Sequence, residues 1–179
     1  MRKAETLLNI IRDRGKRGLV VKDIYRMLYQ KDLYLTAYAK LYKNNGAMTK
    51  GATMETVDGM SMEKINNLIE LLKFERYRWT PVRRIYIPKK GKNQMRSLGL
   101  PSYSDKLLQE VIRLILEAYY EPQFSESSHG FRPGRGCHTA LQMVAQKGSG
   151  TKWFIEGDIK ACFDRIDHTV LINILKKDF

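Results

Sequence analysis

The spacing of hydrophobic residues predicts that helices form the first part of the chain. A short amino-terminal helix is expected over 7–11, and two further helices over 23–28 and 33–42, where apolar side chains recur every three or four positions. The segment 44–60 lacks such a period and contains several glycines, so we expect a long loop. Ser61 then has the character of an N-cap, which predicts that a helix begins directly after it.

Two β-prone runs follow this helical region. Residues 82–88 and 95–100 are rich in branched and aromatic side chains, and the six residues between them are polar and include Gly91. Such a pattern is typical of a β-hairpin with a glycine in its tip.

The strongest helical pattern in the chain comes next. Pro101 and Ser102 mark its start. On the solvent-facing side of the helix, ion pairs are expected between Lys106 and Glu110 and between Arg113 and Glu117. A broad apolar stripe predicts that the helix belongs to the core. The stripe consists of Leu107, Leu108, Val111, Ile112, Ile115 and Leu116.

Shorter elements are expected in the last third of the chain. After a turn-rich segment over 125–136, the pattern predicts a helix over 139–147 and a strand over 153–158. A short helical turn and a final helix over about 168–177 complete the chain.

Composition excludes several classes of protein. With 179 residues, of which 43% are hydrophobic, the chain is neither collagen-like nor wholly disordered. No apolar run reaches the ~20 residues of a membrane-spanning helix, and the first residues lack the features of a signal peptide, so we expect a cytosolic protein with no membrane partner. Cys137 and Cys162 are too few for a disulfide scaffold or a structural zinc site, and reduced, at least half-buried thiols are expected.

The charge of the chain gives the first indication of function. A net charge of +13 attracts polyanions, and residues 76–96 contain eight basic residues and no acidic one. A solvated charged face is the alternative, but such faces usually mix both signs, and Tyr77, Trp79 and Tyr86 are interleaved here. We therefore favour nucleic-acid or nucleotide binding. The eight are Arg76, Arg78, Arg83, Arg84, Lys89, Lys90, Lys92 and Arg96.

Candidate catalytic chemistry lies in 153–164. If 153–158 is a strand, its period of two places Glu156 and Asp158 on one face, with Asp158 at the carboxyl end, where a carboxylate can hold a divalent metal. On spacing alone, an aspartate that caps a helix or forms an ion pair is the stronger interpretation, and Asp164 and Asp167 are expected to cap or brace the following helices. As a function, a metal-dependent nuclease that uses Glu156 and Asp158 is a further alternative, although no further carboxylate or clustered histidine completes its site.

Four motifs occur in order along the chain, at 84–89, 96–101, 128–135 and 156–160 with Phe163 and Asp164. These motifs resemble those of reverse transcriptases encoded by group II introns, and the resemblance covers residues 30–179. The upstream segments 45–47 and 57–59 are also similar, although the Pro-Gly that usually precedes Val-Asp-Gly in this family is absent here.

The resemblance implies the amino-terminal part of an intron reverse transcriptase and maturase. The implied fold class is α+β, namely reverse-transcriptase-like fingers and a partial palm, rich in helix, with a β-hairpin and a short antiparallel palm sheet. Residues 1–60 would be an amino-terminal extension and upstream fingers region, 61–150 the fingers with the hairpin, and 151–179 the start of the palm.

Roles for individual residues follow from the same resemblance. Lys89 and Arg96 match positions that hold the triphosphate of a deoxynucleotide, a task suited to a lysine point charge and a bidentate arginine. Asp158 would be the first catalytic ligand of Mg²⁺, with the backbone carbonyl of Ile159 as a further ligand. Phe163 matches the residue that excludes a ribose 2′-hydroxyl, with ordinary core packing as the alternative.

Other basic residues are expected to contact template or intron RNA. In the loop 130–135, glycines would let the backbone approach nucleic acid, with a simple turn before the next helix as the alternative. The residues expected to bind nucleic acid are Arg76, Arg78, Arg83, Arg84, Arg132, Arg135, Lys22, Arg26 and Lys31.

The chain also departs from the family pattern. No Asp-Asp hairpin follows Asp158, so two of the three expected metal carboxylates are missing. We therefore expect part of an RNA-directed DNA polymerase, with RNA, DNA primer and deoxynucleotide as partners and Mg²⁺ in the complete enzyme, that is inactive alone. The alternative is a non-catalytic RNA-binding maturase module that assists splicing.

Overall fold

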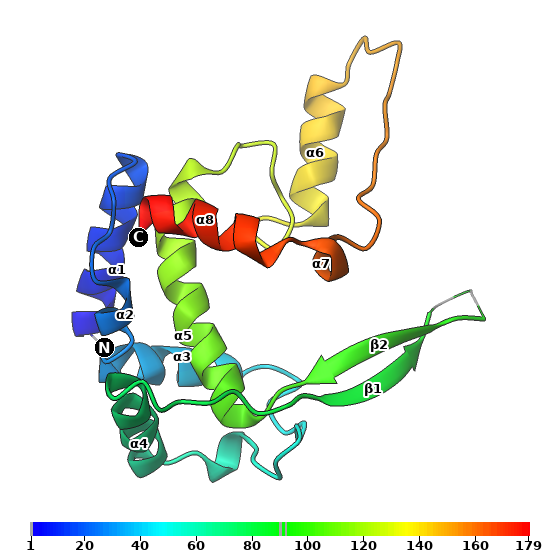
Figure 1. The fold of residues 1–179 in the computed structure, drawn as a ribbon. Helices are drawn as coiled ribbons and strands as arrows, with labels where there is room; N and C mark the ends of the chain where they lie inside the picture. The colour runs from blue at the N-terminus through cyan, green and yellow to red at the C-terminus, as the bar shows by residue number, and fades with distance from the viewer. Residues whose placement is uncertain (1, 90, 92) are drawn as a thin grey trace.

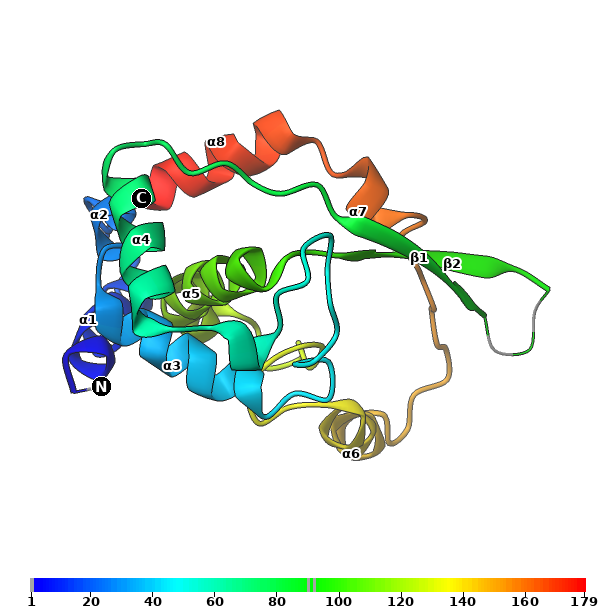
Figure 2. The ribbon, with the colours of Figure 1, turned by 90° about the horizontal axis from the view of Figure 1, so that it is seen from below.

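The computed structural model describes residues 2–89, 91 and 93–179 and confirms an α+β chain rich in helix (Figure 1). A helical body occupies one side of the molecule, and a single β-hairpin projects from it (Figures 1 and 2). The elements are α1 (Arg2–Lys16), α2 (Ile24–Met27), α3 (Lys31–Tyr42), η1 (Val57–Gly59), α4 (Met62–Lys73), β1 (Arg83–Pro88), β2 (Met95–Leu100), α5 (Tyr103–Tyr120), η2 (Glu121–Gln123), α6 (Cys137–Lys147), α7 (Cys162–Arg165) and α8 (His168–Asp178).

The central helix is α5, whose apolar stripe is buried as predicted. Leu107, Val111 and Ile115 are completely or almost completely inaccessible to solvent and pack in one core with Ile11 of α1 and Leu33 of α3. Burying each such side chain contributes roughly 1.5–3 kcal/mol. The same core includes residues of α4, so it crosses the expected boundary between 1–60 and 61–150.

Helices α1 and α5 approach each other closely at Gly15. A Cβ atom built on Gly15 would lie 2.1 Å from the carbonyl oxygen of Tyr119, a distance that no side chain can occupy. Only glycine allows this contact, which sets the position of α1 along α5.

The last helix, α8, returns to the core at its carboxyl end. The hydroxyl of Tyr120 donates a hydrogen bond of 2.7 Å to Asp178 Oδ2, and the backbone N–H of Val21 donates one of 2.8 Å to the Asp178 carbonyl. The Phe179 ring lies 4.9 Å from that of Tyr119. These contacts fix the final helix against the helical body.

Side chains cap the helices much as the sequence indicates. Ser61 Oγ accepts a hydrogen bond of 3.2 Å from the N–H of Lys64, which confirms it as the N-cap of α4. Asp167 caps α8 by accepting hydrogen bonds from Val170 N and Thr169 N, and these bonds lower the pKa of its carboxyl.

Strands β1 and β2 form an antiparallel hairpin in which Arg83 pairs with Leu100 and Ile87 with Arg96. The ladder continues one step beyond β1, where the N–H of Lys89 donates to the carbonyl of Gln94 over 2.8 Å. Because side chains alternate between faces, Arg83 and Arg84 lie on opposite faces of the hairpin. Lys90 and Lys92, at the tip, lie outside the described residues.

Three expectations from the sequence are wrong in the last two thirds of the chain. Residues 153–158 form no strand, because the only sheet among the described residues is the β1–β2 pair and no neighbouring backbone offers these residues hydrogen-bond partners. The expected palm sheet is therefore not formed here. The second wrong expectation is the ion pair between Lys106 and Glu110. The Lys106 ammonium instead donates a hydrogen bond of 3.0 Å to the Thr49 carbonyl.

The third wrong expectation concerns the two cysteines. Both are exposed rather than buried or half-buried, and the helices that carry them have no buried residue. The expected ion pair between Arg113 and Glu117 does form, and Arg113 also pairs with Glu110 at 2.8 Å. None of the helices over the described residues is long and apolar enough to cross a membrane.

Candidate nucleic-acid interface

The β-hairpin presents Lys89 and Arg96 on one face. Arg96 lies opposite Ile87, and Lys89 follows two positions after Ile87, so the alternation of the strand places both basic side chains on the same side. Both are exposed, and within the described chain no salt bridge neutralises either of them. Among the described residues, Lys89 Nζ has one hydrogen-bond partner, the amide oxygen of Gln94 at 3.4 Å. This face can therefore receive an anionic group.

The base of the hairpin is fixed by the buried carboxylate of Asp105, whose residue is 1% exposed. Oδ1 accepts a hydrogen bond of 2.6 Å from the Tyr77 hydroxyl, and Oδ2 accepts bonds from Thr80 N at 3.2 Å and Ser102 Oγ at 2.7 Å. Tyr77 and Thr80 precede β1 and Ser102 follows β2, so one side chain holds both ends of the hairpin. Burial, together with the hydrogen bond to Asp105, raises the pKa of the Tyr77 hydroxyl and keeps it a donor.

The long loop 44–60 also contacts the base of the hairpin. Arg83 donates from an Nη atom to the Lys50 carbonyl over 2.8 Å, and Lys106 binds the adjacent carbonyl of Thr49. Burial lowers the pKa of the Lys106 ammonium. At Gly51 a Cβ would lie 2.1 Å from the Pro101 carbonyl oxygen, so the loop backbone lies directly against the end of β2.

Three further basic residues lie on the hairpin or directly before it. Arg84 is exposed on the face opposite Arg83, near Tyr86 of the same face. Arg76 lies over the ring of Phe74, with 5.7 Å between the guanidinium carbon and the ring centroid, and Arg78 donates to the carbonyls of Glu75 and Tyr77. All of these guanidinium groups are partly open to solvent, as an interface with phosphates requires.

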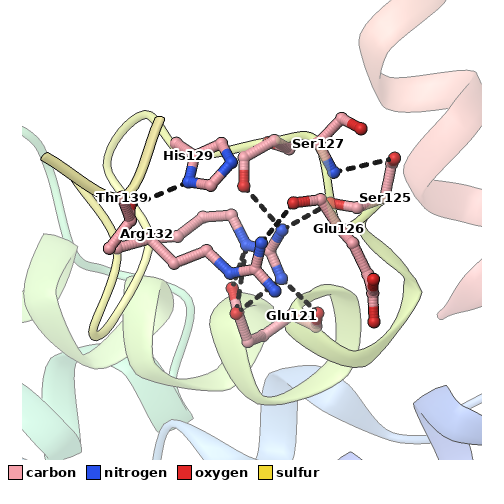
Figure 3. A network of polar contacts seen from close by, with 9 residues as sticks. Glu121, Ser125, Glu126, Ser127, His129, Arg132 and Thr139 are labelled. Carbon is pink, nitrogen blue, oxygen red and sulfur yellow. Dashed lines mark hydrogen bonds and ion pairs between the residues drawn. The ribbon is translucent and has the colours of Figure 1, made fainter. Parts of the chain in front are cut away.

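Arg132 is held inside its own loop rather than offered to a ligand (Figure 3). Its side chain is 7% exposed, and its guanidinium pairs with Glu121 at 2.9 Å while donating to the carbonyls of Ser125 and Ser128 at 2.7 and 2.8 Å. The Phe124 ring lies 5.4 Å from its guanidinium carbon. A contact with phosphate does not fit this arrangement, because each guanidinium nitrogen already has a protein partner.

The same loop presents a fully exposed phenylalanine. Phe131 has a φ of 57° and Gly134 a φ of 68°, so the loop makes two left-handed turns on either side of Arg132. Arg135 donates to the Glu126 carbonyl, and His129 Nδ1 lies 2.8 Å from Thr139 Oγ1 (Figure 3). The loop is thus more than a simple turn before α6, since side chains from both of its ends hold its shape.

The residues expected to bind RNA near the amino terminus lie apart from the hairpin. Lys22 precedes α2, Arg26 lies on α2 and Lys31 begins α3, and all three are exposed. Figure 1 shows α2 and the hairpin at opposite ends of the molecule. The structure therefore does not bring these two groups of basic residues together.

Asp158 and Ile159 lie in the exposed segment that precedes α7, and Phe163 lies on α7 itself. Phe163 is 85% exposed, so core packing does not explain its presence in this structure. Both views place α7 on the side of the molecule from which the hairpin projects (Figures 1 and 2). Over the described residues, no group of three or more histidine, cysteine or acidic side chains comes together to hold a metal ion.

Two residues that organise this region could not be identified from local sequence patterns. Asp105 has the pattern of an ordinary acidic residue in the first turn of a helix, and Glu121 that of a solvated residue at a helix end. Only their distant partners, Tyr77 and Arg132, reveal what they do.

Known proteins resemble this chain over much of its length. Residues 87–177 match the family model described as reverse transcriptase (RNA-dependent DNA polymerase). The group II intron-encoded protein LtrA of Lactococcus lactis subsp. cremoris is 53% identical over 152 residues, which are 85% of this chain and 25% of that protein. The uncharacterized 91 kDa protein in cob intron of Schizosaccharomyces pombe is 44% identical over 180 residues, covering 97% of this chain and 22% of that protein.

A third relative is named as a maturase. Nuclear intron maturase 1, mitochondrial, of Arabidopsis thaliana is 40% identical over 77 residues, which are 43% of this chain and 11% of that protein. The chain therefore spans about a quarter or less of the length of each of these three relatives.

Proposed function

The chain belongs to the reverse transcriptase family of group II intron-encoded proteins, and on that premise we propose that it forms the fingers and the first part of the palm of an RNA-directed DNA polymerase. Residues 1–60 are the amino-terminal extension and the upstream fingers region, 61–150 the fingers with the hairpin, and 151–179 the start of the palm. The partners are template and intron RNA, a DNA primer and a deoxynucleotide.

The main support for this proposal comes from the hairpin. Lys89 and Arg96 share a face that no described acidic residue neutralises, and the Asp105 carboxylate anchors both ends of the hairpin. A pair of cations on one face of an anchored hairpin suits the triphosphate of an incoming deoxynucleotide, because the backbone that carries them does not have to be ordered at the moment of binding. Phe163 on α7 limits the space near the sugar in this proposal.

Reverse transcriptases generally use Mg²⁺, but the described residues of this chain do not fit a complete site for it. Asp158 contributes one carboxylate and Ile159 one carbonyl, whereas a two-metal centre needs further acidic ligands. In this proposal Asp158 and Ile159 act as ligands only in the complete enzyme, and the chain alone does not polymerise DNA.

RNA binding involves the basic residues around the hairpin. Arg76, Arg78, Arg83 and Arg84 contact phosphates, while Arg135 does so from the loop before α6. Arg132 has a different part: it holds that loop in shape through Glu121. Lys22, Arg26 and Lys31 form a second, separate basic surface for intron RNA.

Deoxynucleotide binding tests the proposal. We expect a fluorescent dNTP analogue to bind the chain in the presence of an RNA template and DNA primer, and the double substitution Lys89→Ala with Arg96→Ala to weaken this binding at least tenfold, since charge-assisted hydrogen bonds contribute roughly 1.5–3 kcal/mol each. A matched control replaces the exposed Lys43 and Lys147, which removes the same charge elsewhere. Equal weakening in both double variants would contradict the assignment.

A non-catalytic maturase module is the second candidate. It is favoured by the lack of a metal-binding cluster in the described residues, and one relative is named a maturase. A splicing assay with a cognate intron RNA, combined with primer extension, separates the two. Stimulated splicing that survives the Lys89 and Arg96 substitutions, without dNTP binding, favours the maturase, whereas dNTP binding that depends on them favours the polymerase fragment.

A further inference from the structure

A pocket of about 520 Å³ opens where the end of α4 meets α2 and α5, and the proposed function does not use it. Its floor is apolar, and its walls include three aromatic side chains and two of opposite charge. The floor consists of Leu28, Leu72, Leu108 and Ile112, and the walls of Tyr25, Tyr77, Trp79, Arg78 and Glu75. We call this the Trp79 pocket.

The aromatic walls of the Trp79 pocket are held in place from behind. The Tyr77 hydroxyl is anchored on Asp105 at 2.6 Å, and the Tyr25 hydroxyl donates to the Leu72 carbonyl over 2.9 Å. The rings of Tyr77 and Trp79 meet edge to face at 5.5 Å and 89°. Trp79 is nevertheless 53% exposed, so part of its indole ring remains open to a ligand while its contact with Tyr77 restrains it. An exposed, fixed aromatic face is the usual platform for an unpaired base.

Glu75 holds an unusual backbone position at the rim. It has a φ of 55°, in the left-handed region that favours glycine, and it ends α4 in a turn where Arg76 N donates to the Leu71 carbonyl over 2.8 Å. Its carboxylate is the acidic group of a pocket that Arg78 also lines, with Arg76 adjacent in the chain. A carboxylate repels phosphate but accepts hydrogen bonds from the amino group of a base.

We propose that the Trp79 pocket binds one unpaired, amino-bearing base of RNA. The base stacks on Trp79, its exocyclic amino group donates to the Glu75 carboxylate, and Arg76 and Arg78 contact the flanking phosphates. Among pyrimidines the pocket therefore prefers cytosine, which has an amino group at position 4, to uracil, which has a carbonyl there. This inference rests on the proposed function only in that the ligand is RNA.

Tryptophan fluorescence tests the pocket directly, because the chain contains only Trp79 and Trp153. In the variant Trp153→Phe, the emission reports on Trp79 alone. We expect titration with octacytidylate to quench this emission, and octauridylate to bind at least fivefold more weakly, as one base-specific hydrogen bond to a charged acceptor implies.

Two variants distinguish a loss of base binding in the pocket from a loss of folding. Glu75→Gly keeps the left-handed turn, since glycine adopts it without strain, and is expected to retain RNA binding while losing the preference for octacytidylate. Trp79→Leu, followed by the anisotropy of labelled RNA, should weaken binding of both oligonucleotides about tenfold, the magnitude of one stacked base. Circular dichroism checks that both variants fold.

The outcomes distinguish the two proposals. RNA binding by anisotropy without a change in Trp79 emission, or with equal affinity for both oligonucleotides, overturns the Trp79 pocket and leaves the proposed function intact. A chain that binds no RNA at all overturns both. A cytosine preference that survives Glu75→Gly contradicts the role of the carboxylate.

Discussion

The hydroxyl of Tyr77 donates a hydrogen bond of 2.6 Å to the carboxylate of Asp105, 28 positions later in the chain. This bond joins the segment that enters the hairpin to the first turn of α5, the most deeply buried helix. The orientation of the hairpin relative to the helical body therefore depends on a pair of residues that no local pattern connects.

Removing the Tyr77 hydroxyl should destabilise the fold. Tyr77→Phe removes the donor that binds Asp105 Oδ1 among the described residues, and we expect a loss of about 1–3 kcal/mol in the free energy of unfolding, measured by urea denaturation. Tyr86→Phe is the matched control, because Tyr86 is exposed on the hairpin and should tolerate the change within about 0.5 kcal/mol. Similar losses for both variants would contradict the anchoring role of the pair.

Alkaline pH should destabilise the chain through its buried tyrosines. Burial raises the pKa of Tyr103 to about 12 and also raises that of Tyr77. Since these hydroxyls ionise near pH 10 in the unfolded chain, the folded state binds their protons more tightly. Their contribution to stability is complete below pH 10 and is lost as the pH rises from 10 towards 12. Urea midpoints between pH 8 and 11.5 should fall, and fall less steeply in Tyr77→Phe; equal slopes would argue against this linkage.

The contact between α1 and α5 predicts a steric effect at Gly15. Gly15→Ala places a methyl group against the Tyr119 carbonyl, so the two helices must separate, at a cost of about 1–3 kcal/mol by thermal or chemical unfolding. Gly59→Ala is the control, since a Cβ there meets open space and the backbone φ is not left-handed. An unchanged melting temperature for Gly15→Ala would show that the helices do not approach as described.

The loop before α6 should lose its shape without Arg132. Arg132→Ala removes the ion pair with Glu121 and the bonds to the carbonyls of Ser125 and Ser128, and we expect chymotrypsin to cleave after the exposed Phe131 several times faster. Arg165→Ala, an exposed arginine of α7, serves as the control. If the two variants are cleaved at the same rate, the network does not order the loop.

Local sequence signals were sufficient for elements whose determinants are close in the chain. The apolar stripe of α5, the N-cap at Ser61 and the hairpin over 83–100 depend on spacing and turn chemistry within a few residues, and each prediction is confirmed. The strand expected over 153–158 depends on a partner strand that the described residues do not supply. A strand pattern alone does not form a sheet.

The candidate site also contains features with local determinants and features that depend on distant residues. The alternation of β1 and β2 is enough to place Lys89 and Arg96 on one face. The internal role of Arg132 could not be inferred, because the sequence does not show that Glu121 and two carbonyls surround its guanidinium. An arginine in a glycine-rich loop has the same local pattern whether it binds phosphate or its own chain.

The salt dependence of RNA affinity tests most directly the claim that the basic residues beside and within the hairpin bind RNA phosphates. For single-stranded RNA, the slope of log K against log salt concentration changes by about 0.7 for each phosphate contact that is lost. Arg84→Ala should therefore reduce the slope by about 0.7, and the double variant with Arg83→Ala by about 1.4, with the Lys43 and Lys147 double variant as the control. Slopes that stay at the original value in both arginine variants would contradict the account.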